Sequence, residues 1–382
     1  MSQKTCLEYV RDLSEKKRII DGNLGKKRDT PDQLQNWSGI FYFPDRNEME
    51  VVMKLKAFLF AVAVMFFCNS TNSHASADYE VQHKSAVVIA MFGTTVEPAL
   101  QSLINIRTKI EQRFPNTEVR IAFTSNIIRK KWQRRAEDPE YIKAHPEIPE
   151  DILQVKTPLA TIADLQNGGY NNIVIQPTHV SMGEEFLDLH TYVKALMDMG
   201  TFKKPKYKPF HKIALGRPAL GTYGTKFPYS EDIVTLAKAM APDAELARQE
   251  NASIVYMGHG NEYFPGNGGA YLEFAARMRK MYPEVVTTIG NVEGFPGIED
   301  VMEALKLYGV KKVVLKPFMV VAGDHSINDM AGDEEDSWKS ILVKNGFEVV
   351  TVTKGLGENE NFCNIFVDHA VDAAKDAGIE LK

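Results

Sequence analysis

Short apolar runs alternate with stretches of helical spacing from residue 85 to the end of the chain. Apolar runs of this length, bounded by glycine, proline or polar residues, are typical of strands that are buried on both faces. We therefore predict strands at 85–92, 119–123, 172–177, 212–215, 253–257, 285–289, 312–317 and 348–352. Strands that alternate with helices predict an α/β fold with mostly parallel, doubly wound sheets.

Two segments of the chain resemble each other and indicate a duplication. Residues 172–183 align with residues 312–323, and the alignment matches a proline, a valine and the final glycine of each segment. We predict two similar α/β domains, at 78–224 and 225–358, with a cleft between them, while a C-terminal helix at 359–382 can pack back on the first domain. In sheets of this kind, ligands bind beyond the carboxyl ends of the strands.

The first 77 residues have a different pattern. Two lysines precede an uninterrupted apolar run at 57–67, and the small residues Ala75–Ala77 end the segment. This order predicts a secretory signal peptide at 53–77, because the apolar run is shorter than the ~18–20 residues that span a bilayer. We expect a mature chain that begins near Asp78, is exported to the periplasm and keeps no membrane anchor.

A signal peptide normally stands at the N-terminus, yet 52 residues precede this one. These residues carry two short basic clusters and no sustained apolar period. We interpret residues 1–52 as a start-site artefact, with translation beginning at Met53. The alternative is a genuine cytoplasmic extension that places the apolar run as an internal anchor.

Composition narrows the classes of function. The net charge of −5 and the lack of a long basic block disfavour a general nucleic-acid binder. Only Cys363 lies in the predicted mature chain, so that chain cannot form an internal disulfide. The sequence has no phosphate-binding P-loop, no dinucleotide-binding glycine fingerprint and no nucleophile elbow.

Three chemically active side chains follow predicted strands. Glu185 and His325 occupy equivalent positions, two residues after the aligned glycines, and His259 stands between Gly258 and Gly260. Two imidazoles and a carboxylate favour a divalent transition metal, and only three protein ligands leave the site open for transfer of the ion. The alternatives are structural, since histidines at strand ends often only form hydrogen bonds and a glutamate in a first helical turn interacts with the helix dipole.

Other polar residues are weaker candidates. His179 is expected on the wall of the core or the cleft, and His190 on an exposed helix face. The basic segment 129–135 is either a solvated helix face or a site for the carboxylates of an acidic ligand, because guanidinium–carboxylate pairing is strong and directional. Residues 138–151 contain three prolines and are predicted to form an irregular insertion that covers the cleft or contacts a partner.

Several phrases of the sequence resemble the anaerobic cobalt chelatase family CbiK. The longest is Val321–Ala331, and shorter ones are Met91–Thr95, Ala122–Lys130 and Met257–Gly260. The resemblance runs across almost the whole predicted mature chain and implies two similar α/β domains around a tetrapyrrole cleft. It also implies insertion of Co²⁺ into sirohydrochlorin, or its oxidised form, on the path to cobalamin, without an organic cofactor or ATP.

The resemblance implies roles for particular residues. The metal-binding histidines of the family fall on His259 and His325, and its metal-site glutamate falls on Glu185. One of these groups is expected to accept a proton from a pyrrole nitrogen as the metal enters, which makes the three residues catalytic as well. The candidate substrate-binding residues are Arg129, Lys130, Thr94 and Thr95.

The signal peptide departs from the family pattern, because cobalamin assembly is expected in the cytoplasm. Three functions therefore stay open. The chain is an exported chelatase for Co²⁺, an exported iron chelatase, since Fe²⁺ accepts the same ligands, or a periplasmic carrier of metal or haem that is no enzyme. The sequence leaves monomer and homo-oligomer both open.

Overall fold

The computed structural model describes residues 83–202, 204, 207–261 and 266–382, which belong to one compact unit. The predicted signal peptide at 53–77 and the 52 residues before it lie outside the described residues. Within the described ranges, no helix is both long enough and apolar enough to cross a membrane.

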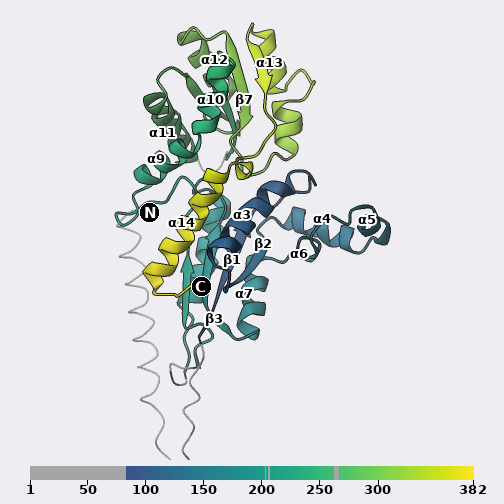
Figure 1. Ribbon diagram of the computed structural model, residues 1–382, viewed down its shortest axis with the longest axis vertical. Coiled ribbons are helices and arrows are strands. Elements are labelled where there is room, and N and C mark those ends of the chain that lie inside the picture. The colour runs from purple at the N-terminus through teal and green to yellow at the C-terminus, as the bar shows by residue number, and fades with distance from the viewer. Residues whose placement is uncertain (1–82, 203, 205–206, 262–265) are drawn as a thin grey trace, which may run out of the picture. The chain divides into compact units, whose positions relative to one another are not determined.

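The first of two sheets contains four parallel strands in the order β2-β1-β3-β4, and Figure 1 labels three of them, β1, β2 and β3. Its helices pack on both faces, because alternate residues of β1 point into different cores. Val87 and Ile89 contact the core that contains α3, whereas Ala86 and Val88 contact the core that contains α7 and α8. The elements are β1 (Lys84–Met91), α3 (Leu100–Arg113), β2 (Glu118–Phe123), α7 (Pro158–Asn167), β3 (Tyr170–Pro177), α8 (Glu184–Met197) and β4 (Lys212–Leu215).

The second sheet repeats this arrangement with the order β6-β5-β7-β8, again with all strands parallel. The identical strand orders agree with the internal duplication seen in the sequence, and the predicted α/β fold class is confirmed. The elements are α9 (Tyr229–Ala239), α10 (Ala241–Gln249), β5 (Ser253–Gly260), α11 (Gly266–Met281), β6 (Thr287–Glu293), α12 (Ile298–Leu307), β7 (Lys312–Pro317), η2 (Ser326–Met330), α13 (Trp338–Lys344) and β8 (Glu348–Thr351).

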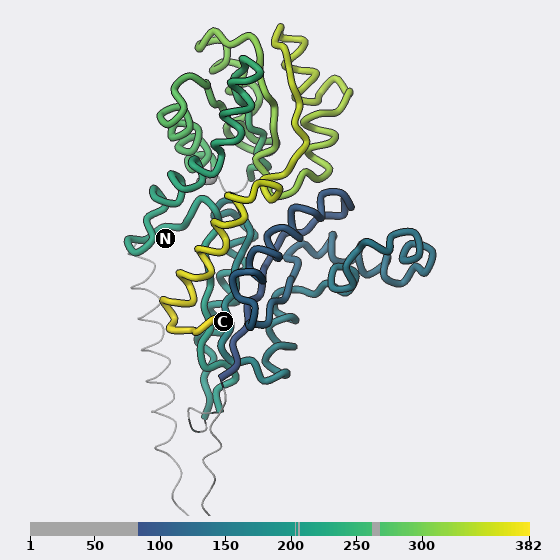
Figure 2. The backbone as a smooth tube through the Cα atoms, in the orientation of Figure 1, coloured from purple at the N-terminus to yellow at the C-terminus, as the bar shows by residue number. Residues whose placement is uncertain are grey.

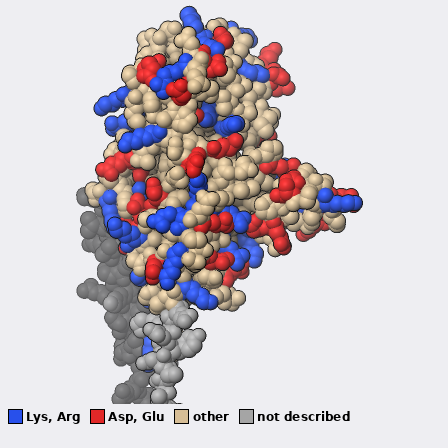
Figure 3. All heavy atoms as spheres, viewed as in Figure 1, with Lys and Arg blue, Asp and Glu red and all other residues tan. Residues whose placement is uncertain are grey.

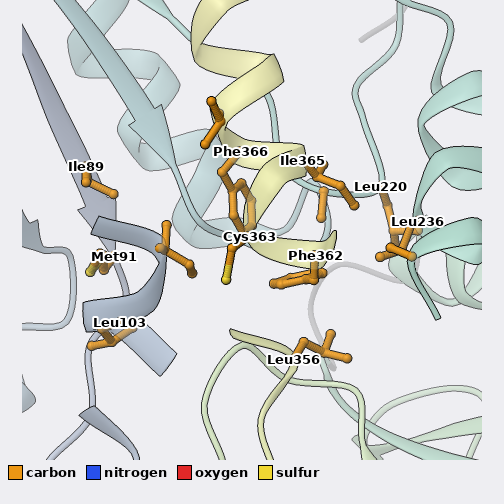
Figure 4. Close-up of a cluster of buried hydrophobic side chains, with 14 of the residues drawn as sticks. Ile89, Met91, Leu103, Leu220, Leu236, Leu356, Phe362, Cys363, Ile365 and Phe366 are labelled. Atoms are coloured by element: carbon orange, nitrogen blue, oxygen red, sulfur yellow. The ribbon is translucent and has the colours of Figure 1, made fainter. Parts of the chain in front are cut away.

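After the second sheet the chain returns to the first. The turn η3 (Leu356–Glu358) leads into α14 (Glu360–Ala377), which packs against α3, β3 and β4 (Figure 2). Figure 4 shows Phe362, Cys363 and Phe366 of α14 in a shared apolar cluster with residues of β1 and α3. Cys363 is a buried free thiol, and burial raises its pKa to about 12, so it serves as a packing residue.

Three helices project from the first sheet between β2 and α7 (Figure 1). They are α4 (Asn126–Ala136), α5 (Pro139–Ala144) and α6 (Glu150–Leu153). The prediction of an irregular segment at 138–151 was wrong in this respect. Asp138 caps α5 by accepting hydrogen bonds from two backbone amides, and Pro139 occupies its first turn, where a proline is tolerated. Proline therefore starts a helix here instead of preventing one.

Candidate active site

The carboxyl ends of strands from both sheets line one cavity of about 370 Å³. This volume lies within the ~300–1,000 Å³ typical of small-molecule sites. Segments that follow β1, β3, β5 and β7 form the walls, and the lining is mainly apolar. The cavity therefore lies at the position where sheets of this topology bind their ligands.

Gly260 allows β5 to reach this cavity beside β6. Its φ of +78° is a conformation that suits glycine, and a Cβ atom there would lie 1.8 Å from the carbonyl oxygen of Glu293. Because Gly260 pairs directly with Glu293, the glycine brings the neighbouring His259 close to that carboxylate. The Nδ1 atom of His259 lies 3.9 Å from Oε2 of Glu293.

The two predicted metal-binding histidines lie side by side. They are close because β5 and β7 are neighbouring strands. Their ring centroids are 4.8 Å apart, and the planes of the two rings are perpendicular. Nδ1 of His259 bonds the carbonyl oxygen of Gly260 at 3.1 Å, and Nδ1 of His325 bonds Oδ2 of Asp329 at 2.5 Å. A carbonyl oxygen only accepts, and a carboxylate does the same, so each bond favours a proton on Nδ1 and a lone pair on Nε2. Each imidazole can therefore bind a cation through its Nε2 atom.

The carboxylate of Glu185 is on the same cavity, in the first turn of α8. It lies close enough to Tyr271 of α11 to contribute to the raised pKa of that phenol, whose main cause is burial. The Tyr271 hydroxyl in turn lies 3.4 Å from Oγ of Ser181, so the two halves of the chain meet at the cavity. Among the described residues, however, no three His, Cys, Asp or Glu side chains are already grouped around one metal position.

The candidate substrate-binding residues separate into two pairs. Thr94 and Thr95 line the cavity, whereas Arg129 and Lys130 are on α4 and are not among its lining residues. α4 contributes Ile128 to the lining, and it also holds the loop that carries the two threonines. Trp132 Nε1 donates to the carbonyl oxygen of Thr94 at 2.8 Å, and the Arg135 guanidinium donates to that of Thr95 at 2.9 Å.

Sequence reasoning missed Glu293. The predicted strand ends at residue 289, but β6 continues to Glu293 and places that carboxylate at the end of a strand. The available signal was a pair of polar residues, Asn291 and Glu293, shortly after the predicted strand. Its proximity to His259 depends on the order of strands in the sheet, and that order is a tertiary property.

Comparison with known proteins gives matches over most of the chain. A sequence model of the cobalt chelatase family (CbiK) matches residues 85–375. The sirohydrochlorin cobaltochelatase of Salmonella typhimurium is 28% identical over 287 residues, which cover 75% of this chain and 95% of that protein. The sirohydrochlorin cobaltochelatase CbiKC of Nitratidesulfovibrio vulgaris is 28% identical over 297 residues, which cover 77% and 93%.

Among solved structures, SirB from Bacillus subtilis with Fe³⁺ aligns with a TM-score of 0.49 and 13% identity. The alignment covers 78% of this chain and all of that one.

Proposed function

Because the chain belongs to the cobalt chelatase (CbiK) family, we propose that it is an enzyme that inserts Co²⁺ into sirohydrochlorin for cobalamin biosynthesis. The observation that carries the proposal is the pair of imidazoles, with ring centroids 4.8 Å apart, beside an apolar cavity within the matched residues. Imidazole nitrogen suits divalent cobalt, and an apolar cavity suits the faces of a macrocycle.

The histidines hold the metal substrate before transfer. His259 and His325 offer Nε2 lone pairs, and we propose that a carboxylate from Glu185 or Glu293 completes the protein ligands. Few protein ligands leave coordination positions to water and to the incoming pyrrole nitrogens. The ion can therefore exchange ligands stepwise from protein to macrocycle.

Metal insertion releases the protons of the pyrrole N–H groups, and these need an acceptor. Glu185 lines the cavity, so its carboxylate is the proposed acceptor of one proton at a time and passes each proton on to solvent water. Two protons leave while one divalent ion enters, which conserves the charge of the ring. No organic cofactor or nucleotide is required for this exchange.

The carboxylates of the tetrapyrrole need a different environment from its ring. Among the described residues that line the cavity there is no lysine or arginine, so the proposal of a basic lining from Arg129 and Lys130 has no support from the geometry. Lys131 of α4 contacts a lining residue, because its Nζ lies 3.4 Å from Oγ1 of Thr95. We propose that the ring enters the cavity while most carboxylates stay at its rim.

The enzyme is proposed to act in the periplasm, on the strength of the signal peptide pattern at 53–77. Cell fractionation and sequencing of the mature N-terminus test this location. A chain that starts near Asp78 in the periplasmic fraction is the expected result, and a cytoplasmic chain that retains residues 1–77 contradicts the proposal.

The activity itself is tested with the protein purified from cells. Sirohydrochlorin and Co²⁺ are mixed with catalytic amounts of protein, and absorbance follows formation of the metallated ring. Many turnovers per protein molecule are expected. Stoichiometric binding of the tetrapyrrole without turnover would instead identify a carrier, and faster insertion of Fe²⁺ in a parallel assay would identify an iron chelatase.

A further inference from the structure

His179 has no assigned role, although it lines the same cavity as the metal-binding candidates. It follows β3 in a loop whose backbone is held on both sides. The amide of Thr178 donates to the carbonyl oxygen of Ala90 at 2.9 Å, and the carbonyl oxygen of His179 accepts from the amide of Ala219 at 3.0 Å. The sheet therefore fixes the backbone of His179 beside the cavity, while no hydrogen bond among the described residues holds its ring.

Both ring nitrogens of His179 are shielded from solvent and have no hydrogen-bond partner among the described residues. Buried polar groups are nearly always paired, and an unpaired one costs about 1–3 kcal/mol. Among the described residues that line the cavity, His179 is the one whose buried side-chain nitrogen or oxygen atoms lack a partner. An unpaired buried imidazole lowers the stability of the ligand-free protein. A bound ligand can supply the hydrogen bond that His179 lacks.

The chemistry of His179 differs from that of the two metal-binding candidates. His259 and His325 each have an oxygen atom that orients the ring, which is typical of metal ligands, and His179 has none. Burial lowers the pKa of His179 to about 4, so the imidazole is neutral near pH 7. A neutral imidazole offers one N–H donor and one acceptor, and it brings no positive charge into the cavity.

We propose that His179 binds the tetrapyrrole substrate by donating a hydrogen bond to one of its carboxylate arms. This inference rests on the proposed function, because it assigns a contact of that substrate. The described residues that line the cavity include no lysine or arginine, so an arm that enters it meets no cation there. A neutral N–H donor can still bind it, and a hydrogen bond to a carboxylate is stronger than one between neutral groups. Substrate entry turns the shielded ring toward the cavity, and rotamer changes of this kind are common at binding sites.

Two substitutions separate this role from a structural one. His179→Phe fills similar space without nitrogen atoms, and His179→Gln keeps a donor that does not titrate. His190→Gln is the control, because His190 is exposed on α8. Metal-free sirohydrochlorin is titrated into each full-length protein by fluorescence, Co²⁺ binding is measured separately, and the Tm is recorded.

We expect His179→Phe to weaken tetrapyrrole binding about 10- to 100-fold, which is the range for one lost hydrogen bond to a charged group. Its Co²⁺ affinity stays unchanged, and its Tm stays equal or rises, since the substitution removes an unpaired buried group. His179→Gln binds more tightly than His179→Phe. With a tetrapyrrole whose carboxylates are amidated, the difference between the wild type and His179→Phe shrinks, because both binding partners of the contact have been changed.

Other results overturn the inference in distinguishable ways. Unchanged tetrapyrrole affinity in His179→Phe refutes the contact, and a loss confined to Co²⁺ makes His179 a metal ligand. A lower Tm with equal losses in both variants indicates a structural role. A difference that persists with the amidated ring refutes the carboxylate as the partner. If the wild type binds no tetrapyrrole, the proposed function fails together with this inference.

Discussion

At the scale of single residues, the site depends on how each histidine is oriented. A backbone carbonyl orients His259 and a carboxylate orients His325, and both leave Nε2 as the atom with the lone pair. The side chains of both are partly exposed, at 44% and 39%, so a hydrated ion can reach them. The two imidazoles therefore form the centre of the proposed metal site.

Replacing either histidine tests this centre. We expect His259→Ala and His325→Ala each to lower the rate of Co²⁺ insertion by more than about 100-fold. Loss of a residue that only orients a metal ligand costs about 10- to 100-fold, and loss of a ligand itself should cost more. Insertion is measured by absorbance, and unchanged tetrapyrrole binding in the same variants shows that the cavity is intact. Variants that retain most of their activity would show that the ion binds elsewhere.

Asp329 is a positioning residue, because it touches His325 and lies four residues after it on the same turn of backbone. Asp329→Asn should weaken Co²⁺ binding about 10- to 100-fold, while tetrapyrrole affinity stays the same. The control is Asp333→Asn, since Asp333 pairs with Lys339 outside the cavity lining. Equal Co²⁺ affinities in the two variants would refute the positioning role.

At the scale of elements, strand order determines which strand ends meet. β5 is the second strand of its sheet, between β6 and β7, so His259 lies between residues contributed by both neighbours. The close approach of β5 to β6 requires a residue without a side chain at Gly260. A change in this one backbone position should alter both the sheet edge and the metal site.

Gly260→Ala is expected to lower both Tm and Co²⁺ affinity. The new methyl group would overlap the carbonyl oxygen of Glu293, and the left-handed backbone costs a non-glycine residue roughly 1–2 kcal/mol. Gly269→Ala is the matched control, because nothing lies within 4 Å of a Cβ there and alanine favours a helix by about 1 kcal/mol. Thermal unfolding that ranks the two variants equally would contradict this account.

At the scale of the whole molecule, a buried ion cluster joins parts of the chain that are distant in sequence. The Arg217 guanidinium donates two hydrogen bonds to Asp232 of α9 and one to Asp372 of α14. His369 of α14 adds a bond to Asp232 at 3.2 Å. The cluster links α9, the first helix of the second half, to α14, the last helix of the described chain, and Figure 1 shows α14 beside the first sheet.

The face of the molecule in Figure 3 carries side chains of both charges next to one another.

Removing the charge at the centre of the cluster should destabilise the fold. Asp232→Asn weakens two of the hydrogen bonds of Arg217 but leaves its bond to Asp372, so we expect the free energy of unfolding to fall by about 1–3 kcal/mol. Urea unfolding at pH 7 measures the loss. An exposed pair provides the control, and Asp164→Asn, which removes a partner of Lys156, should change stability by less than about 1 kcal/mol.

The same cluster predicts how stability depends on acid. Burial alone would raise the pKa of Asp232, but the bonds from His369 and Arg217 outweigh it and lower the pKa. A carboxyl whose pKa is lower in the folded state stabilises the fold above its unfolded pKa of ~3.9, and this contribution disappears as the pH falls through the folded value. The stability difference between wild type and Asp232→Asn should therefore shrink below about pH 4. A difference that is constant from pH 7 to pH 3 would contradict the assignment.

The sequence by itself determined the fold class and the family, and it indicated the duplication and the candidate metal ligands. Apolar runs and their glycine endings are local features, so the eight strands within the described residues could be predicted without a structure. The same features identified His259, His325 and Glu185 as candidates. The family phrases in the sequence led to the same function that the comparisons support.

Only the tertiary structure decided which of these side chains lie together. The order of strands places Glu293 beside His259. Side chains of α4 donate hydrogen bonds to the backbone of Thr94 and Thr95. The ring nitrogens of His179 are buried without a hydrogen-bond partner among the described residues. These relations depend on contacts between residues that are far apart along the chain. Local periodicity reports which face of an element is buried, but it does not report what the buried face meets.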